Sequence, residues 1–279
     1  MTALRGASVR DALDSAVIAI TASGSATPRL DAELLLAHAL GVDRTTLFLD
    51  PEREVGGEAA RAFQTLARRR SVERAPVAYL LGRRGFRRLE LAVDPRALIP
   101  RPETELLVEV GLELPYGARV VDVGTGSGAV ALALKDERPD LDVVGTDVSA
   151  EALDVARGNA GRLGLDVAFV EGDLLCLPPA LGAPDAILSN PPYVADGDPL
   201  PPDVAQHEPW IALHAGPDGL DVIRRLVRAA AASGASLLAL EVGAGQAPAV
   251  VALAREAGFA DVATRADLAG IERVVVARR

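Results

Sequence analysis

From residue 118 to the carboxyl terminus, short apolar runs alternate with amphipathic stretches, and this alternation constrains the fold more than any other feature. Strands that alternate with helices form a mostly parallel, doubly wound sheet with helices on both faces. The sequence therefore predicts an α/β domain with a parallel sheet. The predicted strands are 119–123, 142–147, 167–170, 185–189, 236–242 and 273–277, and the predicted helices are 129–135, 149–159, 220–232 and 248–257.

The part of the chain before this domain has a different pattern. Apolar residues recur at helical spacing in 8–20, 28–40 and 58–71, with a shorter element at 45–49. Pro76 interrupts the helical pattern, and residues 77–100 alternate like a β-hairpin. We predict a small helical domain over 1–80 that recognises a partner, a hairpin linker over 81–100 and the α/β domain over 101–279. In the last of these, Thr104 is expected to cap a helix that runs to Leu114.

Composition excludes several classes of protein. No uncharged apolar run is long enough to span a bilayer, and the amino terminus lacks a basic region followed by an apolar stretch. One cysteine, Cys176, cannot form an internal disulfide, and the three histidines are scattered, so we expect no metal site. We predict a soluble, cytoplasmic monomer without a membrane partner.

Charge is distributed unevenly along the chain. The net charge is −10, which argues against stable binding of nucleic acid over much of the surface. Residues 61–101, however, contain eleven arginines against three acidic residues, a balance of +8. This region is either a solvated helix surface or a docking patch for an acidic or RNA-bearing partner.

A glycine-rich loop follows the first predicted strand of the α/β domain. Gly124, Gly126 and Gly128 allow a sharp turn into a helix and close approach of a ligand to the backbone. Asp147 lies 23 residues after Gly124, at the end of the second strand, where an acid can bind a ribose. NAD and adenosylmethionine both contain a ribose, so the loop and Asp147 fit either cofactor. Asp173, after the third strand, could accept from an adenine amine and favours adenosylmethionine.

The fourth strand ends in Ser-Asn-Pro-Pro-Tyr, residues 189–193. Two consecutive prolines cannot continue a sheet ladder and offer no N–H donors, so the chain turns away in a rigid form that presents acceptors. The Asn190 side-chain carbonyl adds an acceptor, and Tyr193 offers a flat face. Such a group of acceptors at the carboxyl end of a strand suits a planar NH₂ group, and ligands bind at this end of an open α/β sheet.

Together, the glycine loop, the acids after the second and third strands and the Asn-Pro-Pro-Tyr turn resemble the class I adenosylmethionine-dependent methyltransferases. The Asn-Pro-Pro-Tyr form is similar to that of enzymes that methylate planar nitrogens. More narrowly, the chain resembles the HemK/PrmC family of release-factor glutamine methyltransferases. The segments that carry this resemblance are 76–80, 98–105, 122–128, 189–193, 207–209, 212–213 and 218–220.

The resemblance implies an enzyme that transfers a methyl group from S-adenosyl-L-methionine to the side-chain amide nitrogen of the Gly-Gly-Gln glutamine in class I peptide chain release factors, modulating translation termination. It implies these cofactor-binding residues: Gly124, Thr125, Gly126, Ser127, Gly128, Asp147, Asp173, Leu174, Asn190, Arg101, Pro102, Glu103 and Thr104. It implies these catalytic residues: Asn190, Pro191, Pro192 and Tyr193. Many relatives carry an aromatic residue where this chain has Leu174.

The chemistry of the transfer adds a hypothesis about roles. An amide nitrogen is a poor nucleophile because its lone pair is delocalised, so alignment with an activated methyl group is the main requirement. We expect the Asn190 side chain and the Pro191 carbonyl to accept the two amide hydrogens while Tyr193 packs on the amide plane. Residues 194–213 are too rich in proline for a helix and are expected to form a substrate-facing loop that contains His207. The alternative function is methylation of an exocyclic amine in RNA or DNA.

Overall fold

The computed structural model describes residues 7–279, which divide into two compact units. One unit contains the chain up to Gly82 together with Pro201–His207, and the other contains Arg83–Leu200 and Glu208–Arg279. The predicted helical domain began at residue 1, and residues 1–6 lie outside the described part. No helix in residues 7–279 is both long and apolar enough to cross a membrane.

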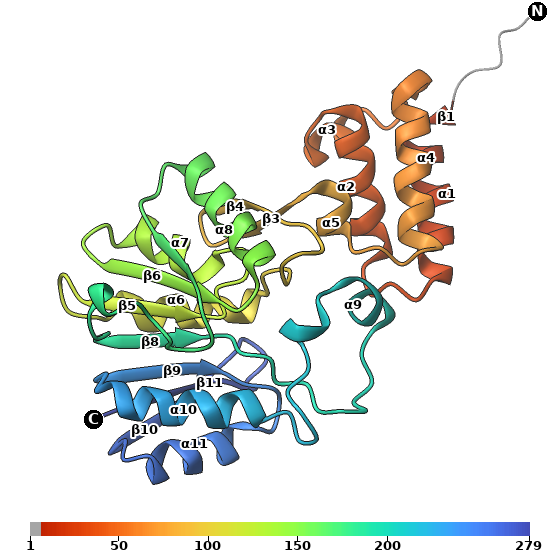
Figure 1. Ribbon diagram of the computed structural model, residues 1–279. Coiled ribbons are helices and arrows are strands. Elements are labelled where there is room, and N and C mark those ends of the chain that lie inside the picture. Colours follow the sequence, from red (N-terminus) through yellow and green to blue (C-terminus); the bar gives the residue numbers. More distant parts are fainter. Residues whose placement is uncertain (1–6) are drawn as a thin grey trace, which may run out of the picture. The chain divides into compact units, whose positions relative to one another are not determined.

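The smaller unit is built from helices, as the apolar spacing predicts (Figure 1). Its elements are β1 (Ala7–Ser8), α1 (Val9–Ala22), α2 (Pro28–Leu40), α3 (Arg44–Leu49), β2 (Glu54–Val55), α4 (Gly57–Ser71), α5 (Val77–Leu81) and α9 (Pro202–His207). Ser8 caps α1 by accepting from the Asp11 N–H, and Gly41 ends α2 in the left-handed conformation. The apolar faces of α1, α2 and α4 pack into one core around Ile20, Leu35 and Phe63.

Three local predictions for this unit are wrong. Residues 77–81, which were expected to be β-like, form helix α5. The two-residue strands β1 and β2 pair antiparallel, although no strand pattern is visible in the sequence. Residues 202–207 form helix α9 within a segment that was expected to be irregular. Pro202 is the first residue of α9, where proline costs no hydrogen bond because the first N–H groups of a helix lack partners inside it.

A buried ion pair links α2 and α4 and reaches α9. The Arg70 Nε donates to Asp31 Oδ2 at 2.7 Å, and an Nη of Arg70 lies 3.4 Å from Asp203 of α9. The Arg70 and Asp31 side chains are 10% and 7% exposed. Asp31 also accepts from the hydroxyls of Ser25 and Thr27. The arginine at position 70 therefore serves the interior of the helical unit.

We expect Arg70→Met to lower the free energy of unfolding by about 3–5 kcal/mol, because it leaves the Asp31 carboxylate buried without its cation. Arg69→Met is the matched control, since Arg69 is one residue away and its contact with Glu73, at 3.6 Å, is about half exposed. The control should cost less than about 1 kcal/mol. Urea denaturation of the three proteins measures both values, and equal losses would contradict the assignment.

The larger unit begins with the predicted hairpin, formed by β3 (Arg83–Phe86) and β4 (Leu89–Ala92). Its main sheet has seven strands in the order β10-β11-β9-β8-β5-β6-β7. The strands are β5 (Arg119–Val123), β6 (Asp142–Asp147), β7 (Ala168–Glu171), β8 (Ala186–Ser189), β9 (Leu237–Glu241), β10 (Asp261–Ala266) and β11 (Glu272–Arg278). Five strands, β5 to β9, are parallel to their neighbours in this group.

The predicted doubly wound sheet is confirmed, but its strands are not parallel at one edge. Strand β11 pairs antiparallel with both β9 and β10, so the sheet is mixed. Strand β10 was not predicted, because Asp261–Ala266 carries a charged or polar residue at three of its six positions and lacks an apolar run. As an edge strand it has a neighbour on one side only, which relaxes the need for a buried sequence.

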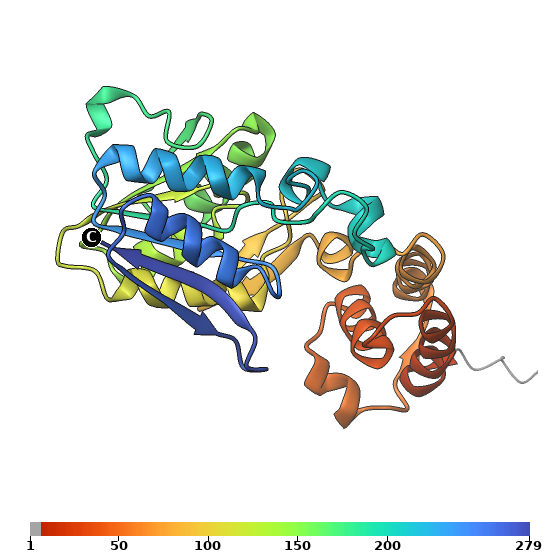
Figure 2. The ribbon, with the colours of Figure 1, turned by 90° about the horizontal axis from the view of Figure 1, so that it is seen from below.

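Helices cover both faces of the sheet, and successive residues of the central strand β5 point to opposite faces. Val120 belongs to the core formed with α6 (Glu105–Leu112) and α7 (Ala129–Glu137). Val121 belongs to the core formed with α10 (Asp221–Ser233) and α11 (Ala247–Glu256), which run along the sheet in Figure 2. The remaining elements are η1 (Pro102–Thr104), α8 (Ala150–Leu163), η2 (Pro179–Leu181) and η3 (Trp210–Ala212).

The strand order creates a place for a ligand. The chain runs from β5 outward to β6 and β7, and then returns to add β8 on the other side of β5. At such a reversal the connections leave in opposite directions, so a crevice opens at the carboxyl ends of the two strands. Here those ends are Val123, followed by the glycine loop, and Ser189, followed by Asn190.

Candidate active site

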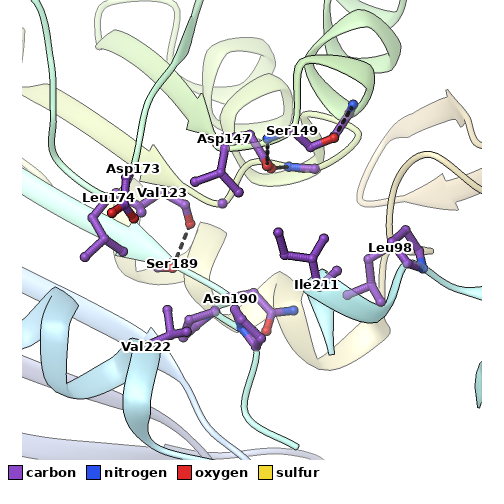
Figure 3. A pocket seen from close by; sticks show the side chains of 18 of the residues that line it. Leu98, Val123, Asp147, Ser149, Asp173, Leu174, Ser189, Asn190, Ile211 and Val222 are labelled. Atoms are coloured by element: carbon purple, nitrogen blue, oxygen red, sulfur yellow. Dashed lines mark hydrogen bonds between the residues drawn. The ribbon is translucent and has the colours of Figure 1, made fainter. Parts of the chain in front are cut away.

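A cavity of about 310 Å³ lies at the carboxyl ends of β5, β6, β7 and β8 (Figure 3). Its volume falls at the lower end of the range for small-molecule sites. Eight of the predicted site residues line it: Gly124, Gly126, Asp147, Asp173, Leu174, Asn190, Pro191 and Pro192. The fold therefore brings together residues that are separated by up to 68 positions in the sequence.

The glycine loop turns from β5 into α7 through left-handed residues. Gly124 and Gly126 have φ values of 70° and 56°, and both line the cavity. A Cβ built on Gly126 meets no atom within 4 Å, so its backbone faces open space. Gly128 has a different role, since a Cβ there would lie 2.9 Å from Leu132 and 3.3 Å from Ala156. The first two glycines thus expose backbone to a ligand, and Gly128 allows close helix packing.

The other two residues of the loop are buried and do not line the cavity. The Thr125 hydroxyl donates to Asp122 at 2.6 Å, and the Ser127 carbonyl accepts from the buried Asn159 amide at 3.0 Å. Burial raises the pKa of Asp122 to about 6, with the Thr125 hydrogen bond opposing the shift. Thr125 and Ser127 therefore stabilise the conformation of the glycine loop. Sequence reasoning did not identify Asn159 and Asp122, which fix this loop from below.

Asp147 joins the loop to the second strand. Its Oδ2 accepts from the Gly126 N–H at 2.9 Å, and its Oδ1 accepts from the Ser149 N–H at 3.0 Å. Burial is the main cause that raises the pKa of this carboxyl above its usual value. Each carboxylate oxygen can accept a second hydrogen bond. Asp147 therefore lines the cavity as a pre-oriented acceptor for a pair of hydroxyl groups.

Asp173 and Leu174 lie together on another wall of the cavity (Figure 3). The Asp173 carboxylate makes an exposed ion pair with Arg225 of α10. Leu174 has a φ of 55°, and its carbonyl accepts from the Thr146 hydroxyl at 3.2 Å. With Val222 of α10, the Leu174 side chain makes this wall apolar. A flat ring can lie against an aliphatic wall of this kind, without an aromatic residue at position 174.

Several lining residues were missed by the sequence prediction. They come from the segment after the hairpin (Arg96, Ala97, Leu98), from the start of α8 (Val148, Ser149, Ala152), from the loop with η3 (Pro209, Ile211, Ala212) and from α10 (Val222, Arg225, Leu226). Most are small or aliphatic, and such residues are also common in cores. Only their tertiary position marks them as cavity residues.

The Asn-Pro-Pro-Tyr turn is held from both sides. The Ser189 hydroxyl donates to the Val123 carbonyl at 2.7 Å, which ties the end of β8 to the end of β5. After the turn, the Tyr193 carbonyl accepts from the Gln246 side chain at 2.9 Å. Pro191 is buried and Pro192 is half-buried, so the turn cannot swing freely. This rigidity presents Asn190 at the cavity in a defined position.

Tyr193 does not line the cavity with Asn190. It borders a separate groove formed with Val194, Ala195, Asp198, Pro199, Leu200, Asp218, Gly243, Ala244, Gly245 and Gln246. Burial is the main cause that raises the pKa of the Tyr193 phenol to about 12, and the nearby Glu241 adds to the shift. Residues 190–193 therefore separate the cavity from the groove and border both.

Residues 101–104 are close to the site but do not line the cavity. Arg101 pairs with the buried Glu208 at 2.5 Å, which in turn accepts from the Ile99 N–H. The prediction that Thr104 caps α6 is wrong, because its side chain makes no cap hydrogen bond. The Thr104 hydroxyl instead accepts from the Asn190 Nδ2 at 3.1 Å. Thr104 thus supports the Asn-Pro-Pro-Tyr turn.

The structure also shows the contacts of His207 and of the arginines in residues 61–101. The His207 Nε2 lies 2.7 Å from the Glu73 carbonyl, and both residues belong to the helical unit. Seven of the eleven arginines in 61–101 form ion pairs: Arg69, Arg70, Arg83, Arg87, Arg88, Arg96 and Arg101. Much of the local positive charge is therefore balanced by carboxylates of this chain.

The seven-stranded sheet, the glycine loop at its reversal point and the acids beside it define a class I methyltransferase. The solved methyltransferase from Pyrococcus furiosus shares this fold, with a TM-score of 0.52 and 18% identity over 68% of this chain and 88% of that one. The family model described as the PrmC N-terminal domain matches residues 11–82, and the one described as the methyltransferase small domain matches 102–206.

Relatives that align over nearly their whole length identify the family within this class of methyltransferases. A release factor glutamine methyltransferase from Deinococcus radiodurans is 46% identical over 97% of this chain and 98% of its own length. One from Mycolicibacterium smegmatis is 42% identical over the same shares. The chain belongs to the release factor glutamine methyltransferase family. The resemblance drawn from the sequence motifs is thereby confirmed.

Proposed function

We propose that this protein transfers the methyl group of S-adenosyl-L-methionine to the side-chain amide nitrogen of the glutamine in the Gly-Gly-Gln motif of class I release factors. The observation that carries the proposal is the position of Asn190, an amide held by Thr104 at the edge of a cavity whose other walls suit a nucleoside. The names of the full-length relatives support the same substrate.

The cavity residues fit the cofactor. Asp147 would accept from the two ribose hydroxyls, and the exposed backbone of Gly124 and Gly126 would lie against the amino acid part. Leu174 and Val222 would pack against the adenine, and Asp173 would accept from its amine. When bound, the cofactor supplies a methyl group on a positively charged sulfur, which activates it toward weak nucleophiles.

The remaining chemistry belongs to the residues of this chain. The Asn190 side-chain carbonyl and the Pro191 carbonyl would accept the two amide hydrogens of the substrate. These hydrogen bonds orient the nitrogen and favour the positive charge that develops on it during transfer. Alignment of two reactants in this way can lower the activation free energy by about 7–11 kcal/mol. A general base is not required before the methyl group moves, so no catalytic role is assigned to His207.

A polypeptide substrate also suits the groove beside Tyr193. Residues 190–193 border both the cavity and the groove, and the lining of the groove includes Ala195 and the Gly243-Ala244-Gly245 segment. The residues that flank the target glutamine would lie in this groove while the glutamine side chain reaches Asn190. Tyr193 would therefore contact the substrate from the groove, instead of packing on the amide inside the cavity.

The test is co-expression with a class I release factor, followed by mass spectrometry of the peptide that contains Gly-Gly-Gln. We expect a mass increase of one methyl group on that glutamine, which is absent without the enzyme. A parallel incubation of the enzyme with ribosomal RNA and labelled cofactor tests the alternative substrate. Label in the RNA together with an unmodified release factor would overturn the proposal.

A further inference from the structure

The segment Asp218-Gly219-Leu220 carries part of the resemblance to the family, yet it has no part in the chemistry described so far. In the fold it lies against the carbonyl of Tyr193, the last residue of the Asn-Pro-Pro-Tyr turn. A Cβ built on Gly219 would overlap that carbonyl oxygen and would lie 3.0 Å from the Ala195 nitrogen. Gly219 also has a φ of 72°, so glycine is required here by the backbone conformation and by the space beside the turn.

The Tyr193 carbonyl is held by one side chain, that of Gln246. The Gln246 Nε2 donates to this carbonyl at 2.9 Å, and the Oε1 accepts from the Gly243 N–H at 2.9 Å. A backbone N–H can only donate and a carbonyl can only accept, so both partners require the same orientation of the Gln246 amide. This side chain therefore joins the turn after β8 to the loop after β9.

The aromatic ring of Tyr193 is confined by the same loop. A Cβ built on Gly243 would lie 3.2 Å from the Tyr193 Cδ2 and 2.8 Å from the Gln246 Oε1. Gly243 does not have a positive φ, so the closeness of these two side chains, and not the backbone conformation, requires glycine here. Tyr193 is thus fixed through its main chain by Gln246 and through its ring by Gly243.

These contacts shape the groove that borders Tyr193, which has a volume of about 540 Å³. The Gln246 Nε2 also lies 3.5 Å from the Asp218 carbonyl. One amide therefore contacts each of the three parts of the chain that line the groove, which are 193–200, Asp218 and 243–246. None of these contacts of Gln246 involves a residue that lines the cavity beside Asp147.

From this geometry we infer that Gln246 is a positioning residue, which fixes Tyr193 and thereby sets the place of the release-factor chain in the groove. The inference rests on the proposed function, in which the residues that flank the target glutamine lie in this groove. Gln246 does not line the cofactor cavity, so it acts on binding of the protein substrate and not on binding of the cofactor. Gly219 and Gly243 serve the same role, because they leave room for Tyr193 and Gln246.

The principal test compares Gln246→Leu and Gln246→Glu by the steady-state kinetics of release-factor methylation. Gln246→Glu is nearly isosteric and keeps an acceptor for the Gly243 N–H, but its carboxylate cannot donate to the Tyr193 carbonyl. Both variants should raise the KM for the release factor by about tenfold, the upper end of what one neutral hydrogen bond contributes. The kcat should change much less than this KM, and cofactor affinity, measured by calorimetry, should be unchanged.

The pH dependence of Gln246→Glu separates this role from a general loss of structure. When the new carboxyl is protonated, its O–H can again donate to the Tyr193 carbonyl. The KM of this variant relative to the wild type should therefore fall as the pH is lowered, whereas the ratio for Gln246→Leu should stay constant. Comparison with the wild type at each pH removes the contribution of other groups that titrate. Ratios that stay equal for the two variants at every pH would contradict the inference.

Gly243→Ala tests the same wall without removing a hydrogen-bonding group. The added methyl group should displace the Tyr193 ring or the Gln246 amide, so the KM for the release factor should rise as it does in the Gln246 variants. Gly161→Ala is the matched control, because Gly161 of α8 also lacks a positive φ and a Cβ there meets no atom within 4 Å. Combining Gly243→Ala with Gln246→Leu should cost less than the product of the single losses, since both changes act on Tyr193.

Two results would overturn the inference. One is a wild-type KM for the release factor in both Gln246 variants. The other is a loss of cofactor affinity that accompanies the rise in KM, because the whole site would then be disturbed. Failure of the proposed function would appear differently, as a wild type that leaves the release factor unmethylated.

Discussion

Replacement of Asn190 by alanine should reduce methyl transfer by about 10²–10³-fold, the range found when one stabilising hydrogen-bond partner is removed from an active site. The loss arises because the substrate amide no longer meets an acceptor at the edge of the cavity. Cofactor affinity should stay nearly intact, since Asp147 and the glycine loop are unchanged. Single-turnover kinetics and calorimetry measure the two quantities separately.

Asn159→Ala is a natural comparison, because Asn159 and Asn190 are the two asparagines of the chain. Asn159 is fully buried and hydrogen-bonds to both backbone groups of Ala92 and to the Ser127 carbonyl. Its loss should lower the melting temperature, whereas Asn190→Ala should leave it close to the wild-type value. If Asn190→Ala lost stability and cofactor binding together, Asn190 would have a structural role instead.

Replacement of Asp147 by alanine should weaken cofactor binding by at least about 10²-fold. Hydrogen bonds to a charged group are each worth about 1.5–3 kcal/mol, and this carboxylate is placed to accept from two hydroxyls. The same change removes the acceptors that hold the Gly126 and Ser149 N–H groups, so the loop loses its preferred shape as well. Calorimetric titration with S-adenosyl-L-methionine measures the effect.

Asp173→Ala is the matched control for Asp147. Both acids follow strands and both line the cavity, but the Asp173 side chain is 52% exposed and pairs with Arg225. Because exposed groups are already solvated and screened, we expect its loss to weaken binding by less than about tenfold. A larger effect at Asp173 than at Asp147 would reverse the assignment of the ribose and adenine sites.

The glycine loop and the turn after β8 show how much of the site can be predicted locally. Gly124, Asp147 and Asn190 were identified because each follows an apolar run, and the carboxyl ends of parallel strands meet at one edge of a sheet. Strand β10 was missed because an edge strand does not need a continuous apolar sequence. The helix α9 was missed because prolines at its start conceal a six-residue helix that belongs to the other unit.

Other outcomes depended on which side chains meet across the fold. Thr104 has a sequence position suited to capping a helix, yet its hydroxyl accepts from the side chain of Asn190, which is 86 residues away. Arg70 looks like one member of a basic run, but the packing of α2 against α4 buries it against Asp31. Hydroxyls and charged groups have several possible partners, and only the folded chain selects among them.

By itself, the sequence determined the α/β architecture, the family and the residues at the strand ends, because these depend on periodicity and short motifs that act locally. The tertiary structure alone decided the antiparallel strand at the sheet edge, the aliphatic walls of the cavity and the hydrogen bond from Asn190 to Thr104. Those features depend on contacts between distant segments. A buried polar group needs a hydrogen-bond partner, and an apolar side chain needs neighbours to pack against. Neither requirement produces a periodic pattern in the sequence that would identify the partner.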